Sequence, residues 1–199
     1  MDSQDKKRQL IIDSAIKRFA HFGLSKITMT EIASDLSMSK ALLYYYFPDK
    51  ISLYSAVLEH IINEIDRDLS KGVERIKSTE KAVVFVLEKR HEYILKYYTI
   101  LDYIRTAASD LPENIQKIIE NAKSSETRII TSILQRGIEK DELTIQDAEE
   151  SSLLLMEALI GMRYITFSQH RNFQIHQDQL HSLLLRQKKL ALIFLKGLR

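Results

Sequence analysis

The chain has 199 residues, which is enough to bury a sizeable core without disulfides or bound metals. Five Gly and two Pro stand among many Leu, Ile, Ala, Glu, Lys and Arg, a composition that favours long helices, so we predict an all-α fold. The lack of Cys excludes thiolate catalysis, zinc fingers and disulfide frameworks, and a net charge of +2 does not by itself indicate binding to nucleic acid.

The first predicted helix covers roughly residues 5–22, where apolar residues recur at helical spacing, and Gly23 follows it as a C-terminal cap. The residues from Met1 to Arg8 contain no apolar run after the basic positions. We therefore predict no secretory signal and a cytoplasmic protein. Residues 1–50 hold eight Lys or Arg against six Asp or Glu, so the positive excess lies in the first quarter of the chain.

Residues 28–47 predict two short helices joined by a tight turn. Thr28 and Glu31 form a capping box, in which each side chain accepts a hydrogen bond from a free backbone N–H. Ser37-Met38-Ser39 then interrupts the helix before a second apolar run begins at Leu42. Two such helices are the minimum that lays one helix in the DNA major groove while the other crosses the backbone, so we predict a helix-turn-helix.

The third helix has a buried side and an exposed side. Leu43 and Phe47 share one side at 100° per residue, and we expect them to pack inward against Phe19 and Ile32. The side left for DNA carries Lys40, Ala41, Tyr44 and Tyr45. An ammonium group and phenolic hydroxyls suit phosphate oxygens, and a small alanine permits close approach.

A long fourth helix follows Pro48, with Asp49 as its N-cap and Lys50 beside its free N–H groups, which favour an anion. Its apolar face consists of Leu53, Val57, Leu58, Ile61, Ile65, Leu69 and Val73. We place a domain boundary inside this helix, near Lys50 to Val57. The predicted domains are a DNA-binding head, residues 1–50, and a ligand-binding and dimerisation body, residues 51–199, joined by this continuous helix.

From Thr28 to Lys50 the sequence TMTEIASDLSMSKALLYYYFPDK closely resembles the N-terminal signature of the tetracycline-repressor (TetR) family of bacterial regulators. The most specific part is Leu43-Tyr44-x-Tyr46-Phe47-x-x-Lys50, preceded by Ser39-Lys40. The resemblance implies a helix-turn-helix head and a helical body that binds a ligand and dimerises. It also implies contacts with the DNA backbone at the positions of Thr28, Lys40, Tyr44, Tyr46 and Lys50.

Three positions depart from the family pattern. Ser37 and Ala41 stand where members usually have Gly, and Leu42 stands where small polar residues are common. Since Ser tolerates a positive φ less well than Gly, we expect a slightly altered turn at Ser37. Tyr46 has an alternative role as a core residue. Our candidates for contact with DNA are Thr28, Ser39, Lys40, Ala41, Leu42, Tyr44, Tyr45, Tyr46 and Lys50.

Five more helices are predicted after Gly72, at roughly residues 79–97, 99–109, 112–138, 146–169 and 177–197. Aromatic rings crowd the first two, and such rings with a few polar tips are the usual lining of a small-molecule site. The resemblance to the family implies a ligand cavity here; the alternative is that these rings fill a helical core. Our candidates for ligand contact are Phe85, Tyr93, Tyr97, Tyr103, Met156 and Arg163.

The helix near residues 146–169 is apolar on two sides, which is typical of a helix between its own core and a partner. Its segment Leu153–Phe167 carries Glu157 and Arg163 and is shorter than the ~20 residues that span a bilayer, so we predict no membrane partner. With the last helix it predicts a four-helix homodimer interface; the alternative is that both helices close the monomer core. The candidate interface residues are Leu154, Ala158, Gly161, Ile165, Leu184 and Ala191.

Catalytic and metal-binding patterns are weak in this sequence. Glu88 and His91 have the spacing of one half of a di-iron motif, which needs a second such pair and two more Glu. His170, His176 and His181 are not spaced to share a ligand face, and we expect them to be solvated. Phosphate loops, nucleophile elbows and zinc-protease helices are absent, so we predict no enzyme, no cofactor and no metal.

The preferred hypothesis is a ligand-responsive homodimeric transcriptional regulator, more a repressor than an activator, that binds a palindromic operator in double-stranded DNA. Its effector would be a small molecule bound in the body. The alternative is a DNA-binding regulator or architectural protein without a small-molecule inducer, gated by a protein partner. An all-α enzyme with a DNA-binding head is a third class, which would require a bound metal or cofactor.

Overall fold

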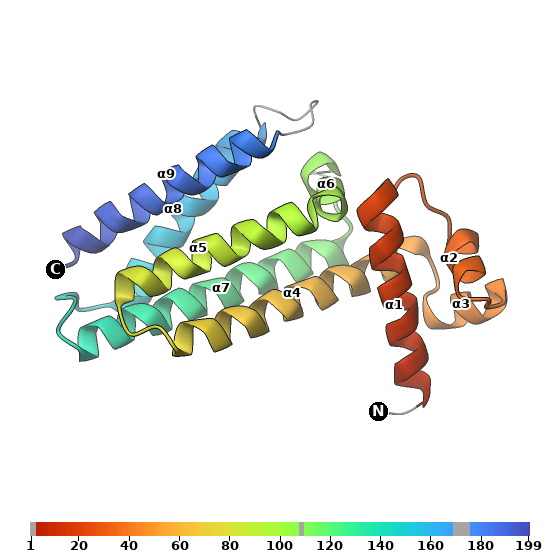
Figure 1. The fold of residues 1–199 in the computed structure, drawn as a ribbon, viewed down its shortest axis with the longest axis horizontal. Coiled ribbons are helices and arrows are strands. Elements are labelled where there is room, and N and C mark those ends of the chain that lie inside the picture. Colours follow the sequence, from red (N-terminus) through yellow and green to blue (C-terminus); the bar gives the residue numbers. More distant parts are fainter. Residues whose placement is uncertain (1–2, 108–109, 169–175) are drawn as a thin grey trace. The chain divides into compact units, whose positions relative to one another are not determined.

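A computed structural model describes residues 3–107, 110–168 and 176–199 of the chain. In this part of the chain there are nine α-helices, α1 to α9, and no strand, so the predicted all-α fold is confirmed (Figure 1). The chain divides into two compact units. The first unit consists of Met1–Glu64 and Tyr97–Ile119, and the second unit consists of Ile65–Lys96 and Glu120–Arg199.

The first unit is built on the three N-terminal helices. It contains α1 (Ser3–Phe22), α2 (Met29–Asp35), α3 (Lys40–Tyr46), α6 (Tyr98–Ala107) and the starts of α4 (Lys50–Glu74) and α7 (Glu113–Glu139). α2 packs on α1 and α3, while α6 packs on α1. The largest fully buried side chains of this unit are Ile11, Phe19, Ile32, Leu43, Leu53, Tyr54, Leu58, Ile100 and Ile115. The expected burial of Leu43 and Phe47 together with Phe19 and Ile32 is confirmed.

Local side chains explain where the first helices end and begin. Gly23 adopts φ +77°, a conformation that glycine tolerates best, and its N–H donates to the Phe19 carbonyl at 2.9 Å. The predicted capping box is present at α2, where the Thr28 N–H donates to Glu31 Oε2 at 2.7 Å and Thr28 Oγ1 accepts from the Glu31 N–H. At α4 the Ser52 N–H donates to Asp49 Oδ1 at 2.6 Å.

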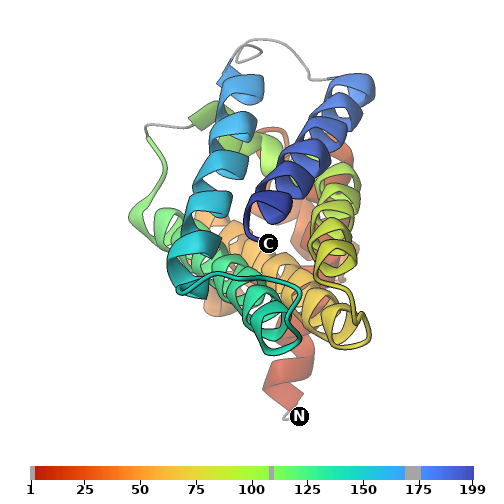
Figure 2. The same ribbon diagram turned by 90° about the vertical axis from the view of Figure 1, so that its left-hand side faces the viewer.

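The second unit contains α5 (Thr79–Lys96), α8 (Ala148–Ser168), α9 (Gln177–Gly197) and the later parts of α4 and α7. α9 packs on both α5 and α8 (Figure 2). Its core includes Leu69, Val83, Val86, Leu87, Ile130, Ile133, Leu134, Leu155, Met156, Leu159, Leu184, Ala191 and Leu195. Apolar burial of this extent is the main stabilising contribution to such a helical unit.

Polar groups inside the second unit are hydrogen-bonded across helices. Arg90 donates to both carboxylate oxygens of the buried Glu126, although burial still raises the pKa of that carboxyl above its ordinary value. The Gln187 side chain donates to the Leu159 carbonyl at 2.9 Å and ties α9 to α8. The unit thus holds a defined helix register through buried bonds as well as apolar contact.

The helices near residues 79–97, 99–109, 112–138, 146–169 and 177–197 correspond to α5 through α9. Residues 108, 109 and 169, which belong to the predicted helices, lie outside the described residues, as does His170. Among the described helices, none is long and apolar enough to cross a membrane.

Candidate nucleic-acid interface and effector region

The turn between α2 and α3 keeps a left-handed residue although the chain has no glycine there. Ser37 adopts φ 51°, and its N–H donates to the Ser34 carbonyl at 3.0 Å, while the Met38 N–H donates to the Ala33 carbonyl at 2.9 Å. These bonds hold the turn in place of a glycine's freedom. An altered turn was expected at Ser37, but the φ angle of Ser37 lies in the left-handed region that a glycine would adopt there.

A bidentate ion pair between Arg18 of α1 and Asp35 of α2 fixes the position of α2 on α1. Arg18 Nε donates to Asp35 Oδ2 at 2.6 Å and Arg18 Nη2 donates to Asp35 Oδ1 at 2.5 Å. This guanidinium lowers the pKa of the Asp35 carboxyl below its usual range. The forked geometry orients α2 as well as attracting it, and the sequence pattern alone gave no sign of this pair.

The outward face of α3 carries the predicted DNA-binding side chains. Tyr45 is 71% exposed and Tyr44 is 40% exposed, and Lys40 and Ala41 are also exposed. The Lys40 ammonium lies over the Tyr44 ring, 5.8 Å from its centroid. Residues 36–48 contain no acidic side chain, so nothing within this segment neutralises Lys40. The result is a positive, aromatic and hydroxyl-bearing face, suited to phosphate oxygens.

The remaining α3 candidates lie at the edge of this face. Leu42 and Tyr46 are half-buried, and the Tyr46 ring meets the Tyr45 ring edge-on at 5.4 Å between centroids. Ser39 is exposed and caps α3, since its Oγ accepts from the Leu42 N–H at 3.2 Å. Thr28 is exposed at the start of α2.

Lys50 is placed differently from Lys40. Its ammonium donates to the carbonyl of Leu24 at 2.9 Å and to the carbonyl of Ile27 at 3.0 Å, and the residue is half-buried. Lys50 therefore fastens the segment between α1 and α2 to the start of α4. The sequence predicted only a phosphate contact for this residue, because nothing in its spacing indicates that two distant carbonyls converge on it.

Comparison with known proteins agrees with this geometry. Residues 11–57 match the family model described as bacterial regulatory proteins of the tetR family. The crystal structure of a transcriptional regulator from Cytophaga hutchinsonii is 30% identical, superposes with a TM-score of 0.88, and covers 96% of this chain and 97% of its own. The chain belongs to the TetR family. It is a helix-turn-helix transcriptional regulator, as the resemblance of its N-terminal motif indicates.

Two further relatives of this TetR-family chain are more distant. The HTH-type transcriptional regulator YhgD of Bacillus subtilis is 22% identical over 170 residues, which make up 82% of this chain and 86% of YhgD. A regulator from Saccharomonospora viridis, solved in complex with choline, is 19% identical, covers 96% of each chain and has a TM-score of 0.69. The structure from Saccharomonospora viridis therefore shows that the two chains have a similar fold.

The six predicted ligand residues do not fall in one unit of this TetR-family protein. Tyr97 and Tyr103 belong to the first unit, whereas Phe85, Tyr93, Met156 and Arg163 belong to the second. The Tyr97 hydroxyl donates to Glu64 Oε2 at 2.8 Å, and the Tyr103 ring meets Tyr54 edge-on at 5.2 Å. Both tyrosines thus have packing roles in the first unit.

Within the second unit the four candidates differ in their surroundings. Phe85 fills the space beside Gly72, where an added Cβ would lie 2.2 Å from the ring. The Tyr93 hydroxyl donates to Asp68 Oδ2 at 2.9 Å. Met156 is fully buried in the core, and Arg163 is 9% exposed. Phe85 and Met156 fit the alternative of core packing that the sequence left open.

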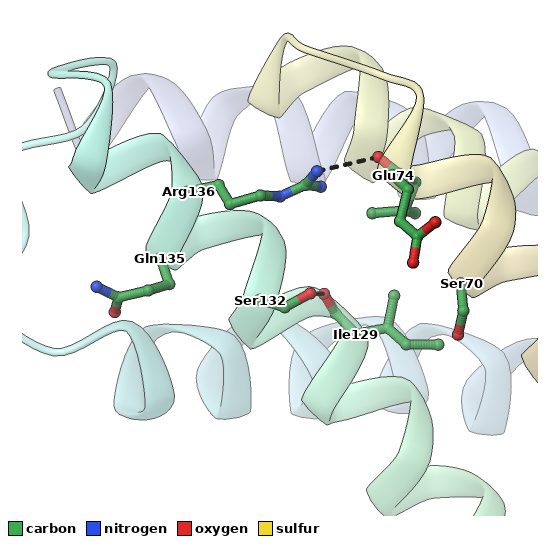
Figure 3. Close-up of a pocket in the computed structure, with 7 residues that line it drawn as sticks. Ser70, Glu74, Ile129, Ser132, Gln135 and Arg136 are labelled. Atoms are coloured by element: carbon green, nitrogen blue, oxygen red, sulfur yellow. Dashed lines mark hydrogen bonds between the residues drawn. The ribbon is translucent and has the colours of Figure 1, made fainter.

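A pocket of about 480 Å³ lies on the second unit between the end of α4 and α7 (Figure 3). None of the six predicted ligand residues lines it. Arg136 crosses its rim and donates to the Val73 carbonyl at 3.1 Å, and Ser132 donates to the Ile129 carbonyl at 2.8 Å. Two of the polar side chains that line this pocket, Ser132 and Arg136, are thus already bonded to backbone. Its lining residues are Ser70, Val73, Glu74, Ile129, Ser132, Gln135 and Arg136.

The predicted interface residues divide between surface and core. On α8, Leu154 is 54% exposed, Ile165 is 56% exposed and Ala158 is exposed, and a Cβ added at Gly161 would meet no atom within 4 Å. On α9, Leu184 and Ala191, which were predicted as interface residues, are instead buried in the core of the protomer. The exposed apolar residues of α9 are Leu185 and Ile193.

Titratable side chains give no metal site in the described part of the chain, where no three candidate ligands come together. His91 of α5 meets His181 of α9 edge-on at 6.2 Å between ring centroids. Burial lowers the pKa of His91, and the neighbouring His181 lowers it further. Glu88, in contrast, accepts from Lys188 at 2.6 Å.

Proposed function

We propose that this TetR-family regulator is a homodimeric repressor that binds a palindromic operator through α3 and leaves it when a small-molecule effector binds. The observation that carries the proposal is the outward face of α3, on which Lys40, Tyr44 and Tyr45 stand exposed without an acidic neighbour in residues 36–48. A helix with such a face, held by a preceding helix and a tight turn, fits the major groove.

The DNA contacts follow from exposure and chemistry. Lys40 and the hydroxyls of Tyr44 and Tyr45 bind phosphate oxygens, while the small Ala41 lets α3 approach the base edges. Thr28, Ser39, Leu42 and Tyr46 flank this face. Lys50 acts chiefly by fastening the loop before α2 through its bonds to Leu24 and Ile27. On this proposal, residues 1–50 form the DNA-binding domain, and residues 51–199 bind the effector and the partner protomer.

Dimerisation uses the outward side of α8. Leu154, Ala158, Gly161 and Ile165 follow one another at intervals of four, three and four residues, which keeps them on one stripe of the helix. Exposed apolar surface of this kind is typical of a protein interface. The small Ala158 and Gly161 allow a facing helix to come close, and Leu185 and Ile193 add apolar area from α9.

An effector would act by favouring one of two conformations. The support is the regulator of similar fold from Saccharomonospora viridis, which was solved in complex with choline. Helices α4 and α7 each begin in the first unit and continue into the second. Through these continuous helices, an effector bound in the second unit would shift the conformation of the first unit. A coupling free energy of about 1–3 kcal/mol between effector and operator is typical of such regulation.

Selection from random DNA tests the proposal. The full-length protein is incubated with duplexes of random sequence, bound DNA is amplified over several rounds, and the enriched sequences are tested for repression of a promoter that contains them. We expect an inverted repeat with half-sites about one helical turn apart or a multiple of it. Tyr44→Phe with Tyr45→Phe should reduce affinity for that site. Failure to enrich any sequence would contradict operator binding, and activation of the promoter would contradict repression.

A further inference from the structure

Arg163 is a charged side chain on the core-facing side of α8. It is 9% exposed, whereas Met156 and Leu159 on the same helix are 0% and 1% exposed. Seven residues on a helix amount to nearly two full turns, so Arg163 leaves α8 on almost the same side as Met156. Its guanidinium therefore emerges from a stripe of residues that pack into the second unit, away from the exposed stripe of Leu154 and Ile165.

No acceptor pairs with this guanidinium among the residues that the structure describes, either as a hydrogen bond or as an ion pair. Four carboxylates of the second unit are paired with other basic side chains: Glu126 with Arg90, Glu88 with Lys188, Glu80 with Arg199 and Glu92 with Lys89. Arginine does not lose its proton in proteins, so Arg163 remains a cation. Within the described part of the chain, Arg163 is thus a largely buried positive charge without a counter-ion.

The nitrogens of Arg163 stay accessible to a small molecule. Among the described residues, no fully enclosed side-chain nitrogen or oxygen lacks a hydrogen-bond partner. Because Arg163 has no such partner, the 9% of its surface that remains exposed includes the guanidinium. A group that is desolvated yet reachable and uncompensated gains more from an incoming anion than a surface arginine does.

We propose that Arg163 anchors a monocarboxylate effector with an apolar body, an inference that rests on the proposed ligand-responsive function. The planar guanidinium offers two parallel N–H donors, which match the two oxygens of a carboxylate. A single cation balances a monoanion, whereas a phosphate dianion would leave one charge uncompensated in an apolar setting. The nearest residues on the same side of α8, Met156 and Leu159, are apolar, which favours an apolar body for the ligand. A quaternary ammonium such as choline has the wrong charge for this position.

Matched ligands separate the charge of the effector from its apolar body. Full-length protein is melted with decanoate, decanol or decyltrimethylammonium, and the straight-chain carboxylates from hexanoate to tetradecanoate cover chain length. We expect one or more carboxylates to raise Tm and to release the protein from its selected operator in a fluorescence anisotropy assay. The alcohol and the ammonium compound should do neither. Equal stabilisation by decanol, or no stabilisation by any carboxylate, would overturn the proposal.

Three variants test the anchor itself. Arg163→Met should bind the carboxylate at least about tenfold more weakly, and without ligand its Tm should equal or exceed that of wild type, because it removes an uncompensated buried charge. Arg163→Lys keeps the charge without the fork and should bind with intermediate affinity. Arg199→Met, which makes the same change at the surface ion pair with Glu80, should bind as wild type.

The variants also distinguish this inference from the proposed regulatory function. A lower Tm for unliganded Arg163→Met, with unchanged carboxylate affinity, would make Arg163 a structural residue and overturn the proposal. If wild type binds its operator but no carboxylate displaces it, the anion site fails while DNA binding stands. If no operator is found but the carboxylate still stabilises wild type and not Arg163→Met, the anion site stands alone.

Discussion

Two lysines of the helix-turn-helix region carry the same charge and have different roles. Lys40 is exposed on α3 and lies over the Tyr44 ring, whereas Lys50 donates to two backbone carbonyls in the first unit. The charge of Lys40 is therefore free to meet a phosphate. Lys50 is already satisfied within the protomer, and its loss would leave the Leu24 and Ile27 carbonyls without this donor.

Replacing Lys50 should accordingly cost stability. We expect Lys50→Met to lower the free energy of unfolding by about 1–3 kcal/mol, the usual cost of leaving partly buried acceptors unpaired. Lys40→Met, the same change at an exposed position, should leave that free energy within about 0.5 kcal/mol of wild type. Urea denaturation of both variants measures the difference. Equal stability of the two would show that the bonds of Lys50 contribute nothing to the fold.

Single residues also show which details a sequence can predict. The roles of Thr28, Asp49 and Ser39 as helix caps were predictable because a cap bonds to a backbone group two or three residues away. The partners of Lys50 and the Arg18–Asp35 pair were not, since they join residues that only the folded chain brings together. On α9 the apolar residues occupy more than one side, so spacing alone did not tell the core residues from the exposed ones.

Helix α8 offers a substitution that should affect the partner protomer without disturbing its own. A Cβ at Gly161 would meet no atom within 4 Å, so Gly161→Leu fits the protomer and should also favour the helix. If a second α8 packs closely there, overpacking typically costs ~1–3 kcal/mol and the dimer should dissociate. Sedimentation at matched concentrations would show a folded monomer for the variant and a dimer for wild type.

Two controls make the Gly161 experiment interpretable. Gly72→Ala should destabilise the protomer itself, because its Cβ would clash with the Phe85 ring at 2.2 Å. Leu185→Ser removes exposed apolar area from α9 and should weaken the same dimer to a smaller extent. If the Gly161→Leu variant is still a dimer like wild type, the interface lies elsewhere on the molecule.

The contact between α5 and α9 should make stability depend on pH. Because the pKa of His91 in the folded protein is lowered by burial and by His181, the unfolded chain binds a proton more readily between the two pKa values. The contribution of His91 to stability is therefore complete when the pH is above the ordinary histidine pKa of about 6.5, and it decreases as the pH falls below that value. The fall in Tm between about pH 7.5 and about pH 5.5 should be smaller in His91→Gln than in wild type.

His21→Gln serves as the control for this measurement, since His21 is an exposed residue of α1. That variant should lose as much Tm on acidification as wild type does. If His91→Gln and wild type lose equal Tm over the same interval, the contact between His91 and His181 is not the source of the pH dependence.

Helices as elements were more predictable than their grouping. Apolar spacing and caps located in the sequence each of the nine helices in the described part of the chain, because both signals are local. The association of α6 with α1, and of the start of α7 with the first unit, had no local signal. The same lack of a local signal explains why the predicted ligand residues Phe85 and Tyr97 fell in different units, although both lie in the segment of residues 85–103 that is rich in aromatic rings.

The assignment of the chain to its family and fold rests on the N-terminal motif and on likeness along nearly the whole chain to a regulator that is 30% identical. The composition indicated helices but not function, since a net charge of +2 is compatible with many roles. The local arrangement of charge on α3 is more informative than the total.

If the exposed face of α3 binds DNA phosphates in a dimer, this binding should determine how operator affinity depends on salt concentration. Affinity is measured for wild type, for Lys40→Met and for Lys189→Met, which changes an exposed lysine of α9 in the second unit. The slope of log affinity against log salt is negative, and each lost phosphate contact reduces its magnitude by about 0.9. If both protomers of a dimer engage the operator, Lys40→Met should reduce the magnitude of the slope by about 1.8 and Lys189→Met should leave the slope unchanged. An unchanged slope for Lys40→Met would contradict the assignment of this face to DNA.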